Sequence, residues 1–279
     1  MEDVLRNWEF PVWLTAAILL TGVIYVCGWM VLRRTRPGQF NGWRLLSFVA
    51  GLASLWIAIG SPLEAAADLL LSAHMIEHLI LMMIVPPLVL LGLPVVPMLR
   101  GLPAIARRGI VGPLARMEGL RGVGQWLVRP PVAWLAMNLT LLGWHVPRAY
   151  DFALENEAWH DFEHICFLAT SLLFWWFVIR PWPAEAHRRE WGVLVYLIGA
   201  DIVNTALSAF LAFYNRPVYR FYVDNPNPFG IAPLPDQVLG AVVMWVVGST
   251  VFLIPAAAIT YSLLQPAQNR INRRTVPAR

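Results

Sequence analysis

The chain has 279 residues, of which 58% are hydrophobic and only 14% are charged. Soluble domains carry roughly 25% charged residues, so this composition excludes an ordinary soluble domain and predicts a membrane protein in contact with the lipid bilayer. The formal net charge of +4 does not indicate nucleic-acid binding, because the basic residues lie between apolar segments instead of forming one basic patch.

Seven apolar segments are long enough, or nearly so, to cross a bilayer, which takes about 20 apolar residues in a helix. They are residues 11–32, 43–60, 71–99, 131–146, 160–180, 191–213 and 237–264. The third contains Pro86, Pro87, Pro94 and Pro97, which predict a kinked helix with a broken end. The predicted fold class is therefore all-α, a polytopic bundle of seven transmembrane helices, with residues 1–279 forming a single membrane domain.

The arginines predict the orientation of this bundle, since cytoplasmic segments of membrane proteins are enriched in basic residues. All 21 basic residues are arginine, and the segments 33–44, 100–129, 180–189 and 270–279 together hold 17 of them. This distribution places the N-terminus outside and the C-terminus in the cytoplasm. We interpret 100–129 as a basic cytoplasmic connection, with or without a short surface helix. The long, Pro-rich connection 214–236 is expected to cap the outer face.

Two copies of His-x-x-Glu-His occur, at residues 74–78 and 160–164. On a helix these offsets place the three polar side chains of each copy within an arc of about 100°. The predicted topology brings both copies and His145 to the same outer depth, whereas His187 falls in a cytoplasmic connection. One His pair at a helix end is often ordinary packing, but ionisable groups that converge inside a membrane bundle are functional candidates. The sequence therefore predicts one metal site. Its candidate ligands are His74, His78, His145, His160 and His164.

The residues around this site bear on the choice of metal. Continuing the first helical face by one turn reaches Met82, and Met244 lies at a comparable depth in the last segment. Imidazole with thioether suits copper, particularly Cu(I), whereas imidazole with carboxylate suits zinc or iron. Methionines at helical spacing are also common core residues. Glu77 and Glu163 are expected to orient the histidines or to balance the charge of the ion.

Asp201 lies in the middle of the sixth segment, with Asn204 one turn further on. A carboxylate at this depth is a candidate for an ion or proton path, and equally for an interhelical hydrogen bond. Cys27 is expected near the cytoplasmic end and Cys166 off the His-bearing face, so neither is predicted to be a ligand.

Several functions use paired histidines on helices. His-x-x-Glu-His is a zinc-peptidase signature in which two His hold the ion and Glu is the general base, although one hydrolytic zinc does not need two copies of it. Histidines on facing helices can also be the axial ligands of a haem. Retinal binding is excluded, because it requires a Schiff-base lysine and the chain has no lysine.

Three segments resemble the seven-helix CtaG family of cytochrome c oxidase assembly factors. They are SAHMIEHLILMMIVPPLVLLGLP at 72–94, GWHVPRAYDFALENEAWHDFEHICFLATSLLFWW at 143–176 and DQVLGAVVMWVVGS at 236–249. The resemblance implies a bacterial plasma-membrane protein that is not an enzyme. It would bind copper and deliver it to a cytochrome c oxidase subunit in the membrane, with an outer-side copper donor as a further partner.

The resemblance supports the five histidines as site residues and adds Asp236 and Met244. In the family the position of Glu77 is often Gln, which counts against a general base there. An intramembrane zinc metallopeptidase and a bis-His haem protein are the alternatives.

Overall fold

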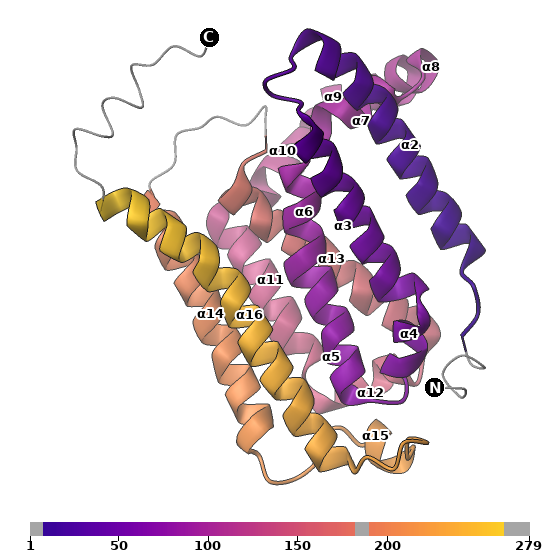
Figure 1. Cartoon of the computed structure of the whole chain (residues 1–279), viewed down its shortest axis with the longest axis vertical. Helices are drawn as coiled ribbons and strands as arrows, with labels where there is room; N and C mark the ends of the chain where they lie inside the picture. Colours follow the sequence, from indigo (N-terminus) through magenta and orange to yellow (C-terminus); the bar gives the residue numbers. More distant parts are fainter. Residues whose placement is uncertain (1–7, 182–189, 265–279) are drawn as a thin grey trace.

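The computed structural model describes residues 8–181 and 190–264, and within these ranges every regular element is helical. The predicted all-α class is confirmed. Long helices run side by side through the molecule and shorter ones lie at its two ends (Figure 1). The long helices are α2 (Val12–Thr35), α3 (Gly42–Gly60), α13 (Glu157–Ile179), α14 (Glu190–Phe213) and α16 (Pro233–Leu264).

Six helical segments of the described chain are long and apolar enough to cross a membrane, as expected for a multi-pass membrane protein. Five are the long helices above, and the sixth is Leu71–Leu91. The predicted fourth span corresponds to α11 (Pro130–Trp144), which has 15 residues. At 1.5 Å per residue it is about 22 Å long, less than the roughly 30 Å thickness of the hydrocarbon core. A seventh crossing, and the orientation of the bundle, remain predictions.

The third predicted segment is broken, as its prolines indicate. It consists of α5 (Leu71–Leu79), a π-helical turn (Ile80–Ile84) and α6 (Val85–Leu91), and α7 (Val95–Gly101) follows after Leu93, whose φ of 52° is left-handed. Pro86 has no N–H to donate to the carbonyl of Met82 four residues earlier. The indole Nε1 of Trp175 donates to that carbonyl instead, at 3.0 Å. The π turn therefore lies where the prolines interrupt the helical hydrogen bonds.

Helices α2 and α7 pack with their backbones in contact. A Cβ atom added to Gly28 would lie 1.8 Å from the carbonyl oxygen of Pro97, and one added to Gly101 would lie 1.8 Å from that of Ile24. Small residues allow this approach, as they commonly do between membrane helices. The pair Gly28 and Gly101 therefore fixes the distance between these two helices.

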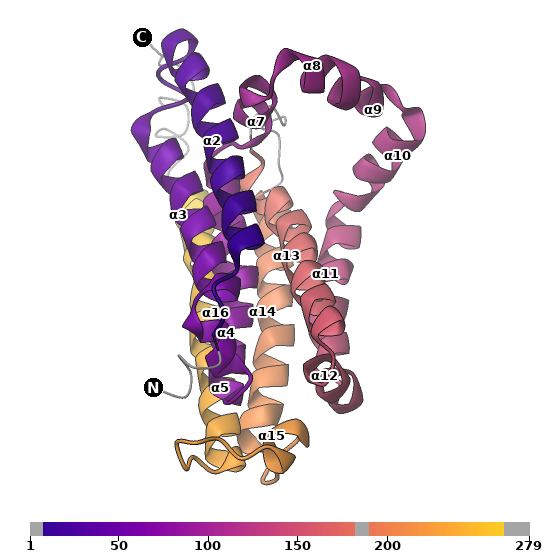
Figure 2. The same ribbon diagram turned by 90° about the vertical axis from the view of Figure 1, so that its right-hand side faces the viewer.

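The predicted connection 100–129 is mostly helical. It contains α8 (Ala104–Ala106), a π turn (Arg107–Val111), α9 (Gly112–Arg116) and α10 (Glu118–Leu127). These helices project away from the bundle (Figure 2). Leu120, Val123 and Trp126 recur along α10 and are all exposed, and a position of this helix at the membrane surface remains a prediction. His187 lies outside the described residues.

The connection 214–236 folds over one end of the bundle, as predicted for a cap. It includes α15 (Phe221–Asp224) and lies beside α12 (Pro147–Leu154) (Figure 1). The hydroxyl of Tyr222 donates to the carbonyl of Ala67, which ends α4 (Pro62–Ala67), at 2.8 Å. The Asp151 carboxylate accepts from the backbone N–H groups of Arg220 and Phe221. The cap is therefore attached to both α4 and α12, next to the predicted site.

Candidate metal centre

Helix α5, which carries the first His-x-x-Glu-His copy, is capped by a distant carboxylate. Its N-cap residue, Leu70, has no side chain able to accept the free N–H groups of the first turn. Asp236 at the start of α16 accepts from Leu71 N at 2.6 Å and from Ser72 N at 3.2 Å. The resemblance marks Asp236 as a supporting residue. Its contacts give it a positioning role, since it fixes the start of the helix that carries His74.

We expect Asp236→Ala to destabilise the protein by about 1–3 kcal/mol, because two backbone N–H groups would lose their acceptors in a buried place. The protein in detergent should melt at a lower temperature than wild type. Asp236→Asn, which keeps one acceptor oxygen, should give a smaller decrease. Asp224→Ala, at an exposed acid of α15, is the control and should leave the melting temperature unchanged. Equal melting temperatures for the two alanine variants would show that the cap contributes nothing.

The two His-x-x-Glu-His copies face each other across α5 and α13. The centroid of the His74 ring lies 4.1 Å from that of His78 and 5.2 Å from that of His160. The centroid of His164 lies 4.3 Å from that of His160 and 5.4 Å from that of His78. Four of the five predicted ligands thus form one cluster.

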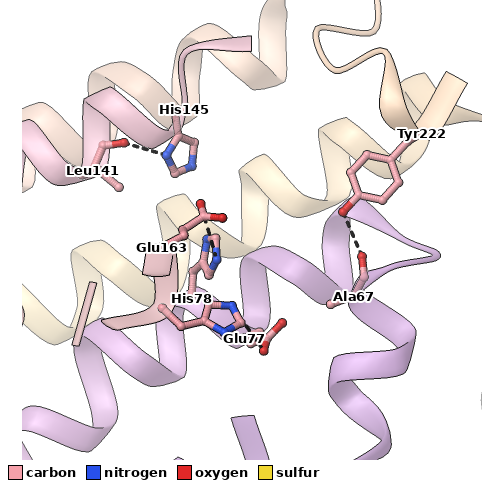
Figure 3. Close-up of polar contacts among 8 residues, drawn as sticks. Ala67, Glu77, His78, Leu141, His145, Glu163 and Tyr222 are labelled. Carbon is pink, nitrogen blue, oxygen red and sulfur yellow. Dashed lines mark hydrogen bonds and ion pairs between the residues drawn. The ribbon is translucent and has the colours of Figure 1, made fainter. Parts of the chain in front are cut away.

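The glutamates connect the two copies in a crossed arrangement. His78 Nε2 lies 3.8 Å from Glu163 Oε1, and His164 Nε2 lies 3.5 Å from Glu77 Oε1. The first of these contacts is visible in Figure 3. Both distances are those of charge contacts and not of aligned hydrogen bonds. Each glutamate therefore lies beside a histidine of the other copy.

Most of the cluster is buried, and most of its buried polar atoms have no hydrogen-bond partner among the described residues. Both ring nitrogens of His74 and His78, and both carboxylate oxygens of Glu77 and Glu163, have no hydrogen-bond partner within residues 8–181 and 190–264. A buried polar group left in this state costs about 1–3 kcal/mol, so such groups are normally hydrogen-bonded or bound to an ion. This donor set, imidazole nitrogen with carboxylate oxygen, fits a transition-metal ion.

Two overlapping sets of side chains have ligand atoms close enough to share an ion. In each set one ligand atom per residue lies within 4.8 Å of all the others. The sets are His74, His78, His160 and Glu163, and Glu77, His160 and His164. His160 belongs to both, so it lies where the two sets meet.

His145 is buried nearby but belongs to neither set. It follows directly on the last residue of α11, and its Nδ1 lies 2.7 Å from the carbonyl oxygen of Leu141 (Figure 3). A carbonyl oxygen only accepts, so Nδ1 must carry the proton and Nε2 keeps its lone pair. His145 Nε2 has no hydrogen-bond partner among the described residues. His145 is therefore available to a ligand, although it remains the least central of the five predicted histidines.

Other predicted supporting residues lie in the surrounding core. Met82 is buried within the π turn, which shifts the helical register that projected it onto the face of His74 and His78. Met244 is buried in α16, and its carbonyl accepts from Asn204 Nδ2 at 3.4 Å. Asp201 on α14 belongs to neither metal set, and its role as an ion or proton path remains a prediction. Cys166 is also absent from both sets, as expected.

An aromatic shell around the cluster was not predicted. The Tyr150 ring centroid lies 5.1 Å from that of His74, and the Phe167 centroid lies 4.4 Å from that of His78. Tyr150 also stacks on Tyr219 of the cap, with centroids 3.9 Å apart. Tyr150 and Asp151 follow shortly after the sequence Trp-His-Val-Pro at 144–147. This pair could have indicated the shell, because Tyr150 contacts the cluster and Asp151 accepts hydrogen bonds from the cap.

Comparison with known proteins places this arrangement in a family. Residues 23–265 match the cytochrome c oxidase caa3 assembly factor (Caa3_CtaG) family. The chain is 31% identical over 255 residues to uncharacterized proteins of Mycobacterium bovis and Mycobacterium tuberculosis, covering 87% of this chain and 37% of each relative. It is 28% identical over 252 residues to an uncharacterized protein of Mycobacterium leprae, covering 85% of this chain and 36% of that relative.

This chain thus spans little more than a third of the length of those relatives. No solved structure gives a significant match. The matched family region includes both His-x-x-Glu-His copies, His145 and Asp236, and its description is that of an assembly factor and not of an enzyme. The chain therefore belongs to the cytochrome c oxidase caa3 assembly factor family.

Proposed function

We propose that the protein binds copper in the histidine cluster and delivers it to a subunit of a haem–copper oxidase in the bacterial plasma membrane. The cluster carries the proposal: four histidines, three of them buried and His160 partly buried, converge with two buried glutamates from two helices, and many of their ligand atoms have no hydrogen-bond partner among the described residues. Family membership supplies the oxidase as the destination. Copper is then the cargo of the protein, and an outer-side copper donor would supply it.

In this function Glu77 and Glu163 orient the histidines and balance the charge of the ion, and they do not activate water. A zinc peptidase needs one Glu beside a metal-bound water, with both histidines of its own motif on that ion. Here Glu77 contacts His164 and Glu163 contacts His78, so each carboxylate supports a ligand on the opposite helix. This crossed contact favours a binding site shared by two helices over two hydrolytic centres.

The cluster lies toward the end of the bundle that carries α4, α12 and α15. We propose that this is the outer side, with α11 as the seventh crossing and the C-terminus in the cytoplasm. The arginine distribution supports this orientation. Copper would then be received and passed on at the outer side of the plasma membrane.

The test measures both the carrier and the oxidase. Purified protein should contain copper by elemental analysis. Oxidase purified from a bacterial host that lacks this protein should contain its haem iron but show a reduced ratio of copper to iron, restored when the protein is supplied again. An unchanged ratio would reject delivery. Zinc in the purified protein together with peptide cleavage would favour the peptidase, and a Soret band would favour the haem protein.

A further inference from the structure

An acidic pocket lies beside the histidine cluster at the predicted outer end. It has a volume of about 1070 Å³ and is formed between the segment before α2, helix α4 and the start of α13. Its charged and ionisable lining residues are Glu9, Glu64, Asp68, Glu157, Asp161 and His160. Among the described lining residues none is arginine, methionine or cysteine. The pocket is therefore acidic and offers carboxylate oxygens as ligands.

The pocket and the cluster meet at His160. His160 lines the pocket and belongs to both metal-binding sets. Its Nε2 atom is buried and has no hydrogen-bond partner within the described chain. Glu77 is 0% exposed, neither of its carboxylate oxygens has a hydrogen-bond partner within the described chain, and it belongs to one metal-binding set with His160. The pocket therefore reaches one donor of the cluster, His160.

We infer that this pocket is the access vestibule through which copper, as hydrated Cu²⁺, reaches the histidine cluster from the aqueous phase. The inference rests on the proposed function, because it assigns the route to the same site. A pocket lined by one sign of charge concentrates the opposite ion and raises its association rate by about 10- to 1000-fold. Carboxylate oxygens are weaker ligands for copper than imidazole, so the ion would pass inward to His160.

The wall of the pocket shows the mutual repulsion that a cation would relieve. Burial, together with the neighbouring carboxyls of Asp68, Asp161 and Glu157, raises the pKa of Glu64 to about 7. Burial also raises the pKa of Asp68. Carboxyls held this close together resist ionisation, and a bound cation favours their charged forms. A cation in the pocket would therefore favour the charged form of Glu64.

The test compares the rate of metal uptake with the amount of metal bound. Cu²⁺ buffered with glycine is mixed rapidly with the metal-free, full-length protein, and the fluorescence of its 14 tryptophans is followed. The double variant E64Q/D68N should take up Cu²⁺ roughly tenfold more slowly, with a weaker dependence on salt, and reach the same stoichiometry as wild type. E155Q, at an exposed acid outside the pocket, should behave as wild type. E157Q/D161N tests the opposite wall independently, should the first pair fail to fold.

The possible results separate this inference from the proposed function. Wild-type stoichiometry with an unchanged uptake rate in both double variants would overturn the vestibule and leave the copper site standing. Loss of bound copper from a correctly folded double variant would make these acids ligands of the site, which contradicts a role in access alone. Absence of copper binding by the wild-type protein would overturn both.

Discussion

Replacing His74 and His164 together by alanine is expected to lower the copper-to-protein ratio of the purified protein to background. The two residues come from different helices and from different metal-binding sets, so the double change removes a ligand from each set. His160 would remain in both sets, but the first set would lose its ligand from His74 and the second its ligand from His164. Elemental analysis of the protein in detergent, after dialysis against a defined copper concentration, measures the ratio directly.

A control is needed because alanine also leaves space in a buried cluster. His187→Ala changes a histidine that belongs to neither motif and should keep the copper ratio of wild type. Circular dichroism and size-exclusion chromatography would show whether the double variant retains its helices. A folded double variant with the wild-type ratio would reject the site. Loss of copper in the His187→Ala variant as well would point to nonspecific binding.

The spacing of the histidines and the predicted topology together predicted the cluster. Offsets of three and four residues on a helix put His74, Glu77 and His78 on one face, and the same holds for His160, Glu163 and His164. The cost of exposing such a face to lipid then predicted that the two faces meet. The crossed contacts were beyond prediction, because they depend on the separation and relative height of α5 and α13. A sequence does not encode these quantities in any local pattern.

The residues around the cluster were harder to predict for a similar reason. Met82 was projected along an ideal helix, but the π turn at Ile80–Ile84 changes the register just before it. The prolines predicted a break in the helix, but they did not predict a π-helical turn. Asp236 is 165 residues from Leu71 in sequence, so its capping role follows only from the packing of α16 against α5. The acidic pocket likewise gathers carboxylates from separate segments.

The predicted spans were accurate where a segment was long and uniformly apolar. Six of the seven predicted segments contain helices long and apolar enough to cross a membrane, whereas α11 is shorter, at 15 residues. Its short length follows from the Pro at position 130, which begins the helix, and from Pro147, which begins the next one after a turn at His145. The turn that shortens α11 is also the one that brings His145 to the edge of the cluster.

Gly28→Ala is expected to cause the largest loss of stability of any single substitution considered for this protein. The added Cβ would lie 1.8 Å from the backbone oxygen of Pro97, and no rotation of a side chain can relieve a contact with backbone. Helices α2 and α7 would have to separate. We expect a cost at or above the upper end of the roughly 1–3 kcal/mol that overpacking usually brings.

Gly22 of the same helix provides a matched control. A Cβ added there would meet Leu52 Cδ1 at 3.5 Å, an ordinary contact, and alanine is favoured over glycine inside a helix by about 0.5–1 kcal/mol. Gly22→Ala should therefore melt at or above the temperature of wild type, whereas Gly28→Ala should melt well below it or fail to accumulate in the membrane. Equal melting temperatures for the two variants would mean that α2 and α7 do not pack backbone to backbone.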